Sequence, residues 1–229
     1  MKKLLTLAVF LSILCAWPTA SRAEGITAGN QMVSGYLGFG VPTNESNIQV
    51  GDVSSTVYST DKVDWGDVSV SYGAQYMYFV TSYLGIGAEI NGNNFTEAEY
   101  SIDTYLASEK IKSRMDVYNF MAAGRINFNP QSRVRAYLPF GLGLATAEST
   151  YKYELEALGG SASAKYSKTD TSFAYYVGVG VEADLSNNWV LGGEMRYNGF
   201  SFDNSKFDSD LSTKDYGYMT FLFKAGYRF

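Results

Sequence analysis

The sequence predicts an all-β protein with eight antiparallel strands, joined up and down, that close into a transmembrane β-barrel. Three observations carry this prediction. Apolar and polar side chains alternate in eight segments, which is the period of a strand. The links between these segments are alternately short and long. The chain is rich in Gly, Tyr and Phe (23, 19 and 14 residues) and has 4 Pro and no His, which suits strands with aromatic ends and closely packed backbones.

The beginning of the chain has the layout of a secretory signal. Two lysines precede an apolar run from Leu4 to about Cys15, and a small-x-small sequence ends at Ala23. The run is too short for a spanning helix, which takes roughly 20 apolar residues. No Pro/Gly/Ser linker divides the rest of the chain. We therefore expect a signal peptide over 1–23 and one outer-membrane β-barrel domain over 24–229.

The first three predicted strands put large apolar side chains on one face and glycine or polar side chains on the other. In Val33–Val41, Leu37 faces outward and Tyr36 faces inward. Asp67–Phe79 alternates Val and Tyr with Ser, Gly and Gln. Tyr83–Asn91 alternates Leu, Ile and Ala with Gly, Glu and Asn. This alternation indicates strands with one apolar face.

The remaining five predicted strands repeat the scheme. Their inward faces carry arginines, lysine and carboxylates beside glycines, and their outward faces carry Val, Leu, Phe and Tyr. The alternation is least regular in the seventh strand. The last strand ends on an aromatic residue with apolar side chains at every second position before it. The five are Tyr118–Phe128, Arg133–Leu144, Phe173–Leu185, Trp189–Tyr197 and Phe221–Phe229.

The connections determine the predicted topology. Three are tight turns, and four are polar segments well beyond the usual loop length of about 4 to 6 residues. Strands of about ten residues with short turns on one side and long loops on the other are typical of outer-membrane barrels. A closed sheet is needed there because every backbone polar group must be paired in lipid. The turns are Val80–Ser82, Asn129–Ser132 and Ser186–Asn188, and the loops are Pro42–Gly66, Gly92–Val117, Thr146–Thr171 and Asn198–Tyr216.

A water-soluble, lipocalin-like barrel is the structural alternative, since it also has eight antiparallel strands. It would turn the apolar face inward and the polar face to water. In this sequence the polar face also carries most of the strand glycines. Small residues and charges together indicate a crowded polar interior, which favours the membrane barrel.

Three features of the sequence are shared with a known family. They are the Gly-x-Gly centres at Gly85/Gly87, Gly141/Gly143 and Gly178/Gly180, the segment Leu185–Tyr197 and the terminal Tyr227–Phe229. In these features the sequence resembles the small outer-membrane barrels of Gram-negative bacteria, which include opacity-type proteins and the barrels of the OmpA and OmpX kind. The resemblance implies a location in the outer membrane, among lipid and lipopolysaccharide. It also implies that the outer-membrane assembly machinery reads Phe229 together with Tyr227.

Nine charged residues share the inward parity and are the candidate site. An eight-stranded barrel is only wide enough for side chains to fill, so these charges must pair, because an unpaired buried charge is costly. We expect a charge network that plugs the lumen. A gated or narrow polar pathway is the alternative, since charges along a lumen also set ion selectivity. The residues are Glu89, Arg125, Arg135, Glu182, Asp184, Glu194, Arg196, Lys224 and Arg228.

Other chemistry has little support in the sequence. The lack of histidine removes the most common general base. The one cysteine lies in the predicted signal, so the usual zinc ligands are missing as well. We expect no catalytic residues, no cofactor and no metal, although Asp203, Asp208 and Asp210 could hold calcium weakly. The formal net charge of −5 argues against nucleic acid, which asks for a basic footprint.

The sequence thus predicts a monomeric, non-enzymatic protein of the outer membrane that acts as a structural or adhesin-like interaction protein. Its long polar loops are the expected contact with a host or surface ligand, because rigid scaffolds place function on loops. The alternative is a channel for small solutes or hydrophobic compounds. An enzyme is a more distant alternative, because a filled lumen leaves no room for a substrate between paired carboxylates.

Overall fold

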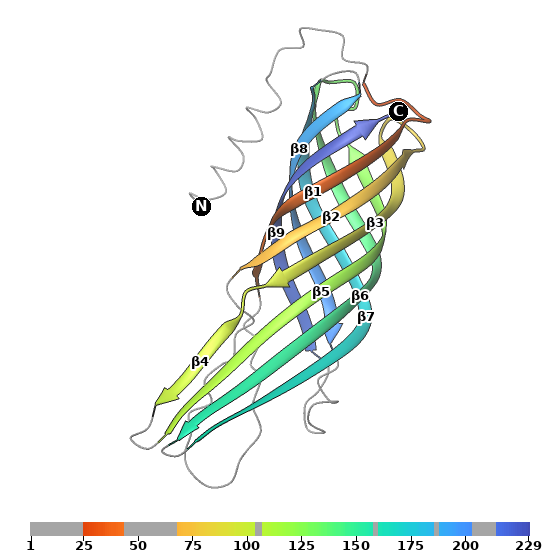
Figure 1. Ribbon diagram of the computed structural model, residues 1–229. Coiled ribbons are helices and arrows are strands. Elements are labelled where there is room, and N and C mark those ends of the chain that lie inside the picture. The colour runs from red at the N-terminus through yellow and green to blue at the C-terminus, as the bar shows by residue number, and fades with distance from the viewer. Residues whose placement is uncertain (1–24, 44–67, 104–106, 158–159, 186–187, 203–213) are drawn as a thin grey trace, which may run out of the picture.

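The computed structural model describes residues 25–43, 68–103, 107–157, 160–185, 188–202 and 214–229. These residues form a closed antiparallel barrel (Figure 1). Within the described ranges, no helix is long and apolar enough to cross a membrane. The strands are β1 Gln31–Pro42, β2 Ser69–Phe79, β3 Leu84–Phe95, β4 Ala98–Asp103, β5 Ala107–Asn127, β6 Val134–Ala157, β7 Gly160–Asp184, β8 Trp189–Phe202 and β9 Lys214–Arg228.

The nine labelled strands make eight positions in the barrel wall. β3 pairs with the half of β5 near its C-terminal end, and β4 pairs with the half near its N-terminal end, so β3 and β4 follow one another as a single wall strand. The ring closes where β1 pairs with β9, from Met32 opposite Arg228 to Pro42 opposite Tyr218. The predicted eight-stranded antiparallel barrel is confirmed.

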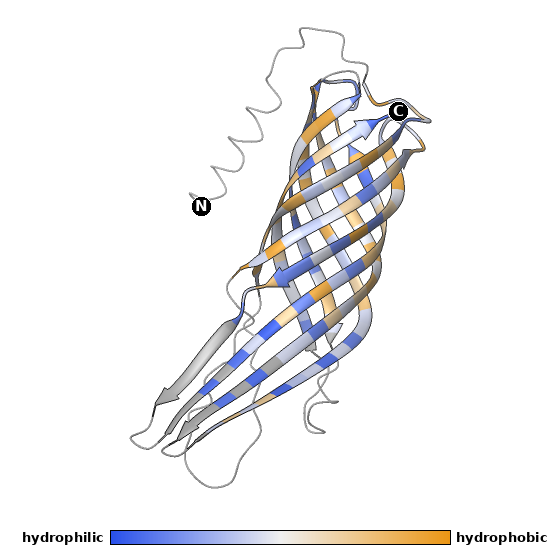
Figure 2. Cartoon of the chain, in the orientation of Figure 1, coloured by the Kyte–Doolittle hydropathy of each residue, from blue (hydrophilic) through white to orange (hydrophobic). Residues whose placement is uncertain are grey.

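The faces of the strands also follow the prediction. Apolar side chains of the predicted outward parity are exposed, for example Leu37 at 61%, Phe120 at 62% and Phe223 at 73%. The alternation along the strands of the barrel wall is visible in Figure 2. Charged residues of the other parity are buried. A soluble barrel would show the reverse arrangement, so the lipocalin-like alternative is wrong.

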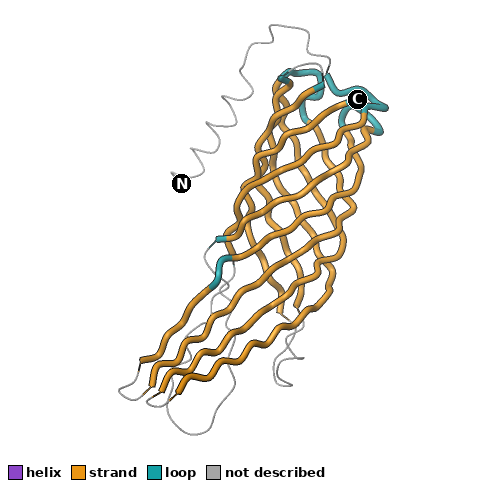
Figure 3. The backbone as a smooth tube through the Cα atoms, viewed as in Figure 1, coloured by secondary structure: helices purple, strands orange, loops and turns teal. Residues whose placement is uncertain are grey.

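The two ends of the barrel differ. At the end that holds the C-terminus, called here the turn end, short links join β2 to β3, β5 to β6 and β7 to β8. At the other end, called the projecting end, β4, β5, β6 and β7 continue as a sheet beyond the barrel wall (Figures 1 and 3). In outer-membrane barrels the short turns face the periplasm, so the projecting sheet faces the outside of the cell.

The projecting sheet corrects the predicted loops. Much of Gly92–Val117 and Thr146–Thr171 is strand: β6 runs to Ala157 and β7 begins at Gly160. β8 and β9 likewise extend into Asn198–Tyr216. These extensions carry many Ser, Thr, Tyr and charged side chains, so they show no apolar period, yet they pair residue by residue with their neighbours. Of the loop Pro42–Gly66, residues 44–66 lie outside the described residues.

Glycines on the inward faces make room for tyrosine rings. Gly180 lies directly opposite Tyr137, and Gly141 lies opposite Tyr176. A Cβ added at either glycine would overlap the ring of its partner. By contrast, the outward-facing Gly193 has no atom closer than 3.8 Å to such a Cβ. The inward glycines are therefore a packing requirement of the lumen.

We predict that Gly180→Val lowers the free energy of unfolding by about 1–3 kcal/mol, because the added side chain displaces the ring of Tyr137. The matched outward change, Gly193→Val, should alter it by no more than about 0.5 kcal/mol. Urea titration of the folded protein in lipid vesicles measures both. Equal effects of the two substitutions would contradict this account.

Candidate functional site

The nine charged residues predicted to face inward lie inside the barrel, and each is at most 6% exposed. They come from six wall strands, β3 and β5 to β9. Each shares the inward parity of its strand, and the closed sheet keeps that side from solvent. The nine form two connected sets, which differ in their position along the barrel.

The turn-end charge group contains Arg125, Arg135, Glu182, Asp184 and Arg228. Arg125 donates two hydrogen bonds to Glu182, both of 2.8 Å. Arg135 donates to Glu182 at 3.0 Å and to the two oxygens of Asp184 at 2.7 and 2.5 Å. Arg228 lies 3.5 Å from Asp184. Two carboxylates are thus shared by three arginines, and the pairs Arg125–Glu182 and Arg135–Asp184 have the bidentate geometry that makes such pairs strong.

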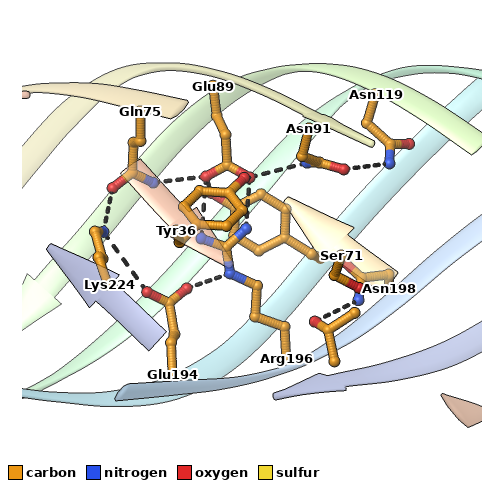
Figure 4. Close-up of polar contacts among 12 residues, drawn as sticks. Tyr36, Ser71, Gln75, Glu89, Asn91, Asn119, Glu194, Arg196, Asn198 and Lys224 are labelled. Carbon is orange, nitrogen blue, oxygen red and sulfur yellow. Dashed lines mark hydrogen bonds and ion pairs between the residues drawn. The ribbon is translucent and has the colours of Figure 1, made fainter. Parts of the chain in front are cut away.

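The central ring is a closed circuit of five side chains: Gln75, Glu89, Glu194, Arg196 and Lys224 (Figure 4). Arg196 donates to both oxygens of Glu89, at 2.5 and 3.1 Å, and its Nε donates to Glu194. Lys224 Nζ lies 3.7 Å from Glu194 and donates to Gln75 Oε1 at 2.5 Å. Gln75 Nε2 then donates to Glu89 at 2.7 Å. The circuit links β2, β3, β8 and β9 across the lumen.

Three buried tyrosines bond to the central ring. Tyr36 and Tyr176 donate to Glu89 at 2.7 and 3.1 Å, and Tyr137 donates to Glu194 at 2.9 Å. Each of the three lies opposite a glycine on the neighbouring strand. Tyr36 was predicted to face inward, but none of the three was predicted to belong to the site. Their position opposite a glycine is the signal that could have identified them.

The same tyrosines contact the arginines through their ring faces. The guanidinium carbon of Arg196 lies 5.1 Å from the ring centre of Tyr36 and 4.3 Å from that of Tyr176. The guanidinium carbon of Arg125 lies 3.9 Å from the ring centre of Tyr137. Such contacts are worth about 2 kcal/mol or more when desolvated. Each tyrosine therefore stabilises a carboxylate through its hydroxyl and an arginine through its ring.

A layer of neutral polar side chains follows the central ring toward the projecting end. Asn119 Nδ2 donates to Asn91 Oδ1 at 2.6 Å, and Ser71 Oγ donates to Asn93 at 2.6 Å. Asn93 in turn donates to the hydroxyl of Tyr218 at 3.0 Å. Most of these side chains are buried and all are hydrogen-bonded. This layer satisfies its polar groups internally, as a buried polar network must.

Apolar clusters fill the lumen at both ends, which the sequence analysis did not predict. The larger cluster begins beside the central ring, where Tyr176 bonds to Glu89, and continues toward the projecting end. It comprises Phe95, Met115, Val117, Met121, Ala145, Ala147, Ala174, Tyr176, Phe200, Tyr216 and Tyr218. At the turn end, beside the charge group, lie Ile26, Met32, Met77, Phe79, Ala123 and Val190. The interior was predicted to be crowded with small residues and charges, but many inward positions toward the ends of the strands carry apolar side chains.

One small cavity of about 10 Å³ lies in the described lumen, among the central ring and the layer of neutral polar side chains, which is enough for about one water molecule. A larger hollow of about 910 Å³ is lined by residues of β7, β8, β9 and β1. Leu37, Leu191 and Phe223 in its lining face the membrane, whereas Tyr36, Glu182 and Lys224 in its lining face the lumen. The larger hollow therefore borders on the charge network.

Among the residues with described positions, no group of three or more His, Cys, Asp and Glu side chains is arranged to hold a metal ion. The acidic loop residues Asp203, Asp208 and Asp210 lie outside the described residues. Within the lumen, every described carboxylate already accepts hydrogen bonds from arginine, tyrosine or glutamine.

The terminal aromatic residues lie on the outer face of the turn end. Tyr227 and Phe229 are 42% and 55% exposed, and the ring of Tyr227 packs edge-on against Trp189 at 5.3 Å. The backbone of Phe229 exchanges two hydrogen bonds of 2.9 Å with Gln31 at the start of β1. The last residue is therefore part of the seam that closes the barrel.

Several solved structures resemble this chain. They include Neisserial surface protein A (15% identity, TM-score 0.49, covering 88% of this chain and 98% of that one). The attachment invasion locus protein Ail of Yersinia pestis, in complex with the heparin analogue sucrose octasulfate, is 17% identical (TM-score 0.46, 89% and 100%). The outer membrane protein OprG of Pseudomonas aeruginosa is 14% identical (TM-score 0.44, 90% and 98%).

No curated protein matches the sequence. The family model described as the outer membrane protein beta-barrel domain matches residues 6–229, which is nearly the whole chain. Its architecture is the one observed, a closed barrel with an apolar outer face and a polar interior. The chain belongs to the outer membrane protein beta-barrel domain family and is a protein of the outer membrane.

Proposed function

We propose that this protein is a non-enzymatic structural or interaction protein of the cell surface, adhesin-like in character, whose lumen is plugged by charges. The observation that carries the proposal is the central ring, in which Glu89, Arg196, Glu194, Lys224 and Gln75 bond to one another across the lumen. These side chains use their polar groups on each other, so none of them is left to select or move a solute.

The energetics support a closed lumen. Breaking a buried ion pair by removing one partner costs about 3–5 kcal/mol, and a passage through the ring requires several such contacts to separate together. The apolar cluster at the projecting end adds a barrier to ions, since hydrophobic constrictions exclude water. A channel for small solutes or hydrophobic compounds needs a continuous cavity along the lumen, whereas the cavity beside the central ring holds about 10 Å³.

The projecting sheet is the proposed interaction surface. Seven successive residues of β7, Ser161 to Ser167, are exposed, and Tyr166 among them is 62% exposed. Partly exposed ion pairs join neighbouring strands, such as Lys112 of β5 to Glu154 of β6 at 4.0 Å. A rigid barrel that carries an extended polar sheet above the membrane suits contact with a host or surface ligand. The apolar outer wall suits outer-membrane lipid and lipopolysaccharide, around a monomeric barrel.

We also propose that the assembly machinery recognises Tyr227 and Phe229. Both side chains face outward at the turn end and contact one another at 6.4 Å between ring centres. They thus lie at the end of the strand that must pair with β1 to close the barrel.

The proposed plug makes a prediction about conductance. Single-channel recording of the folded, inserted protein in planar bilayers should show no steady openings, because the ion pairs and apolar clusters fill the lumen. The variants Arg135→Ala, Glu182→Ala and, as a surface control, Arg114→Ala should be recorded beside it. Steady wild-type openings that change with Arg135→Ala or Glu182→Ala but not with Arg114→Ala would establish a lumenal pathway and refute the plug.

The proposed assembly signal makes a prediction about folding in the membrane. Phe229→Ala should reduce the fraction of protein that reaches the folded state in the outer membrane, measured by heat-modifiable electrophoretic mobility. Phe223→Ala, at the most exposed apolar position, removes the same ring from the same face of β9 and should leave that fraction near the wild-type level. An equal loss in both variants would show that general apolar contact, not the terminal residue, guides assembly.

A further inference from the structure

The segment that precedes β1 crosses the mouth of the barrel at the turn end. The N–H of Ile26 donates to the carbonyl of Pro130, in the turn between β5 and β6, at 2.9 Å. β1 and β6 are four places apart in the ring of eight wall strands, so they lie on opposite sides of the barrel. Near β1, the N–H of Gly29 donates to the carbonyl of Phe79 at 2.8 Å. The segment is thus anchored on both sides of the mouth.

Ile26 points into the lumen. It is 1% exposed although it belongs to no strand, and it clusters with side chains of β1, β2, β5 and β8, including Met77, Phe79 and Ala123. Three residues on the other side of the segment, Thr27 to Gly29, are exposed. The segment therefore has an apolar inner side and a solvent-facing outer side, as a cover over the mouth requires.

Two glycines fit the segment to this position. A Cβ at Gly25 would lie 2.6 Å from Cα of Gln131 and 2.7 Å from the carbonyl oxygen of Pro130, so only glycine allows such a close approach. Gly29 has a φ of 88°, a conformation that other residues rarely adopt. Gln131 Nε2 also donates to the carbonyl of Ile26 at 3.2 Å. The path of the segment is therefore specified by its sequence.

We propose that residues 25–30 form a lid that closes the periplasmic mouth of the barrel, with Ile26 as its sealing side chain. The lid keeps water from the apolar cluster and from the turn-end charge group behind it, where Arg125 stacks over Phe79 at 5.3 Å. The proposed role of the lid does not depend on which ligand the projecting sheet binds.

Cysteine accessibility tests the lid directly. The only cysteine of the chain, Cys15, is replaced by serine, and one probe cysteine is introduced per protein. Ala123→Cys reports on the cluster under the lid, and Ala145→Cys, buried at the projecting end, reports on the rest of the lumen. Each full-length chain is exported with its own leader, purified folded, and labelled with a charged maleimide. Each probe is combined with Ile26→Asp, with Gly29→Val as a second lid variant, and with the control Thr27→Ser.

Ile26→Asp should speed labelling of Ala123→Cys by about ten- to a hundredfold, the factor that corresponds to losing one buried isoleucine. Gly29→Val should act in the same direction. Labelling of Ala145→Cys should not change in either variant, and Thr27→Ser should change neither probe. Unchanged labelling of Ala123→Cys with both lid variants would overturn the proposal. A parallel rise at both probes would also overturn it, because it would show loosening of the whole barrel.

Discussion

A strand that crosses lipid must pair every backbone N–H and C=O group within the protein, and this constraint governs the rest of the structure. It requires the sheet to close on itself, and closure with eight strands leaves an interior only as wide as its own side chains. Every inward residue must then fit against the residues opposite and satisfy its charge there. The apolar outer wall and the internally bonded lumen are both consequences of this one requirement.

Glycine and tyrosine solve the packing problem inside the barrel. A glycine on one strand lets the ring of Tyr137 or Tyr176 lie over the neighbouring backbone. The face of the ring then contacts an arginine, and the hydroxyl group donates a hydrogen bond to a carboxylate. Small residues and charges share one parity for this reason. The charge network is thus built on the glycines as much as on the charged residues themselves.

Much of this architecture could be predicted from the sequence. The alternation identified all eight wall strands and the direction of all nine charged side chains, because side-chain direction follows from parity alone. The partners could not be predicted, since they depend on closure. Arg196 meets Glu89 across the lumen, 107 residues away in sequence. Gln75 completes the central ring, yet a neutral amide carries no charge signal to suggest such a role.

The differences between the predicted and the observed structure also have physical causes. Strands that project into water need no apolar face, so the extensions of β6 and β7 read as loops although their backbones pair throughout. Apolar side chains also face inward toward the two ends of the lumen, so an inward position in this barrel is not always polar. Ile26 was not predicted to face the lumen, because it belongs to no strand and the alternation therefore gives no direction for its side chain. Alternation describes only the membrane-spanning part of a barrel wall.

The most direct test of the account is a double-mutant cycle on the bidentate pair Arg125 and Glu182. The free energies of unfolding of the wild type, Arg125→Met, Glu182→Gln and the double variant give the coupling energy between the two side chains. The account predicts a coupling of about 2–3 kcal/mol, at the upper end of the usual range. A coupling below about 0.5 kcal/mol, typical of an exposed pair, would show that the lumenal charges do not hold the interior together.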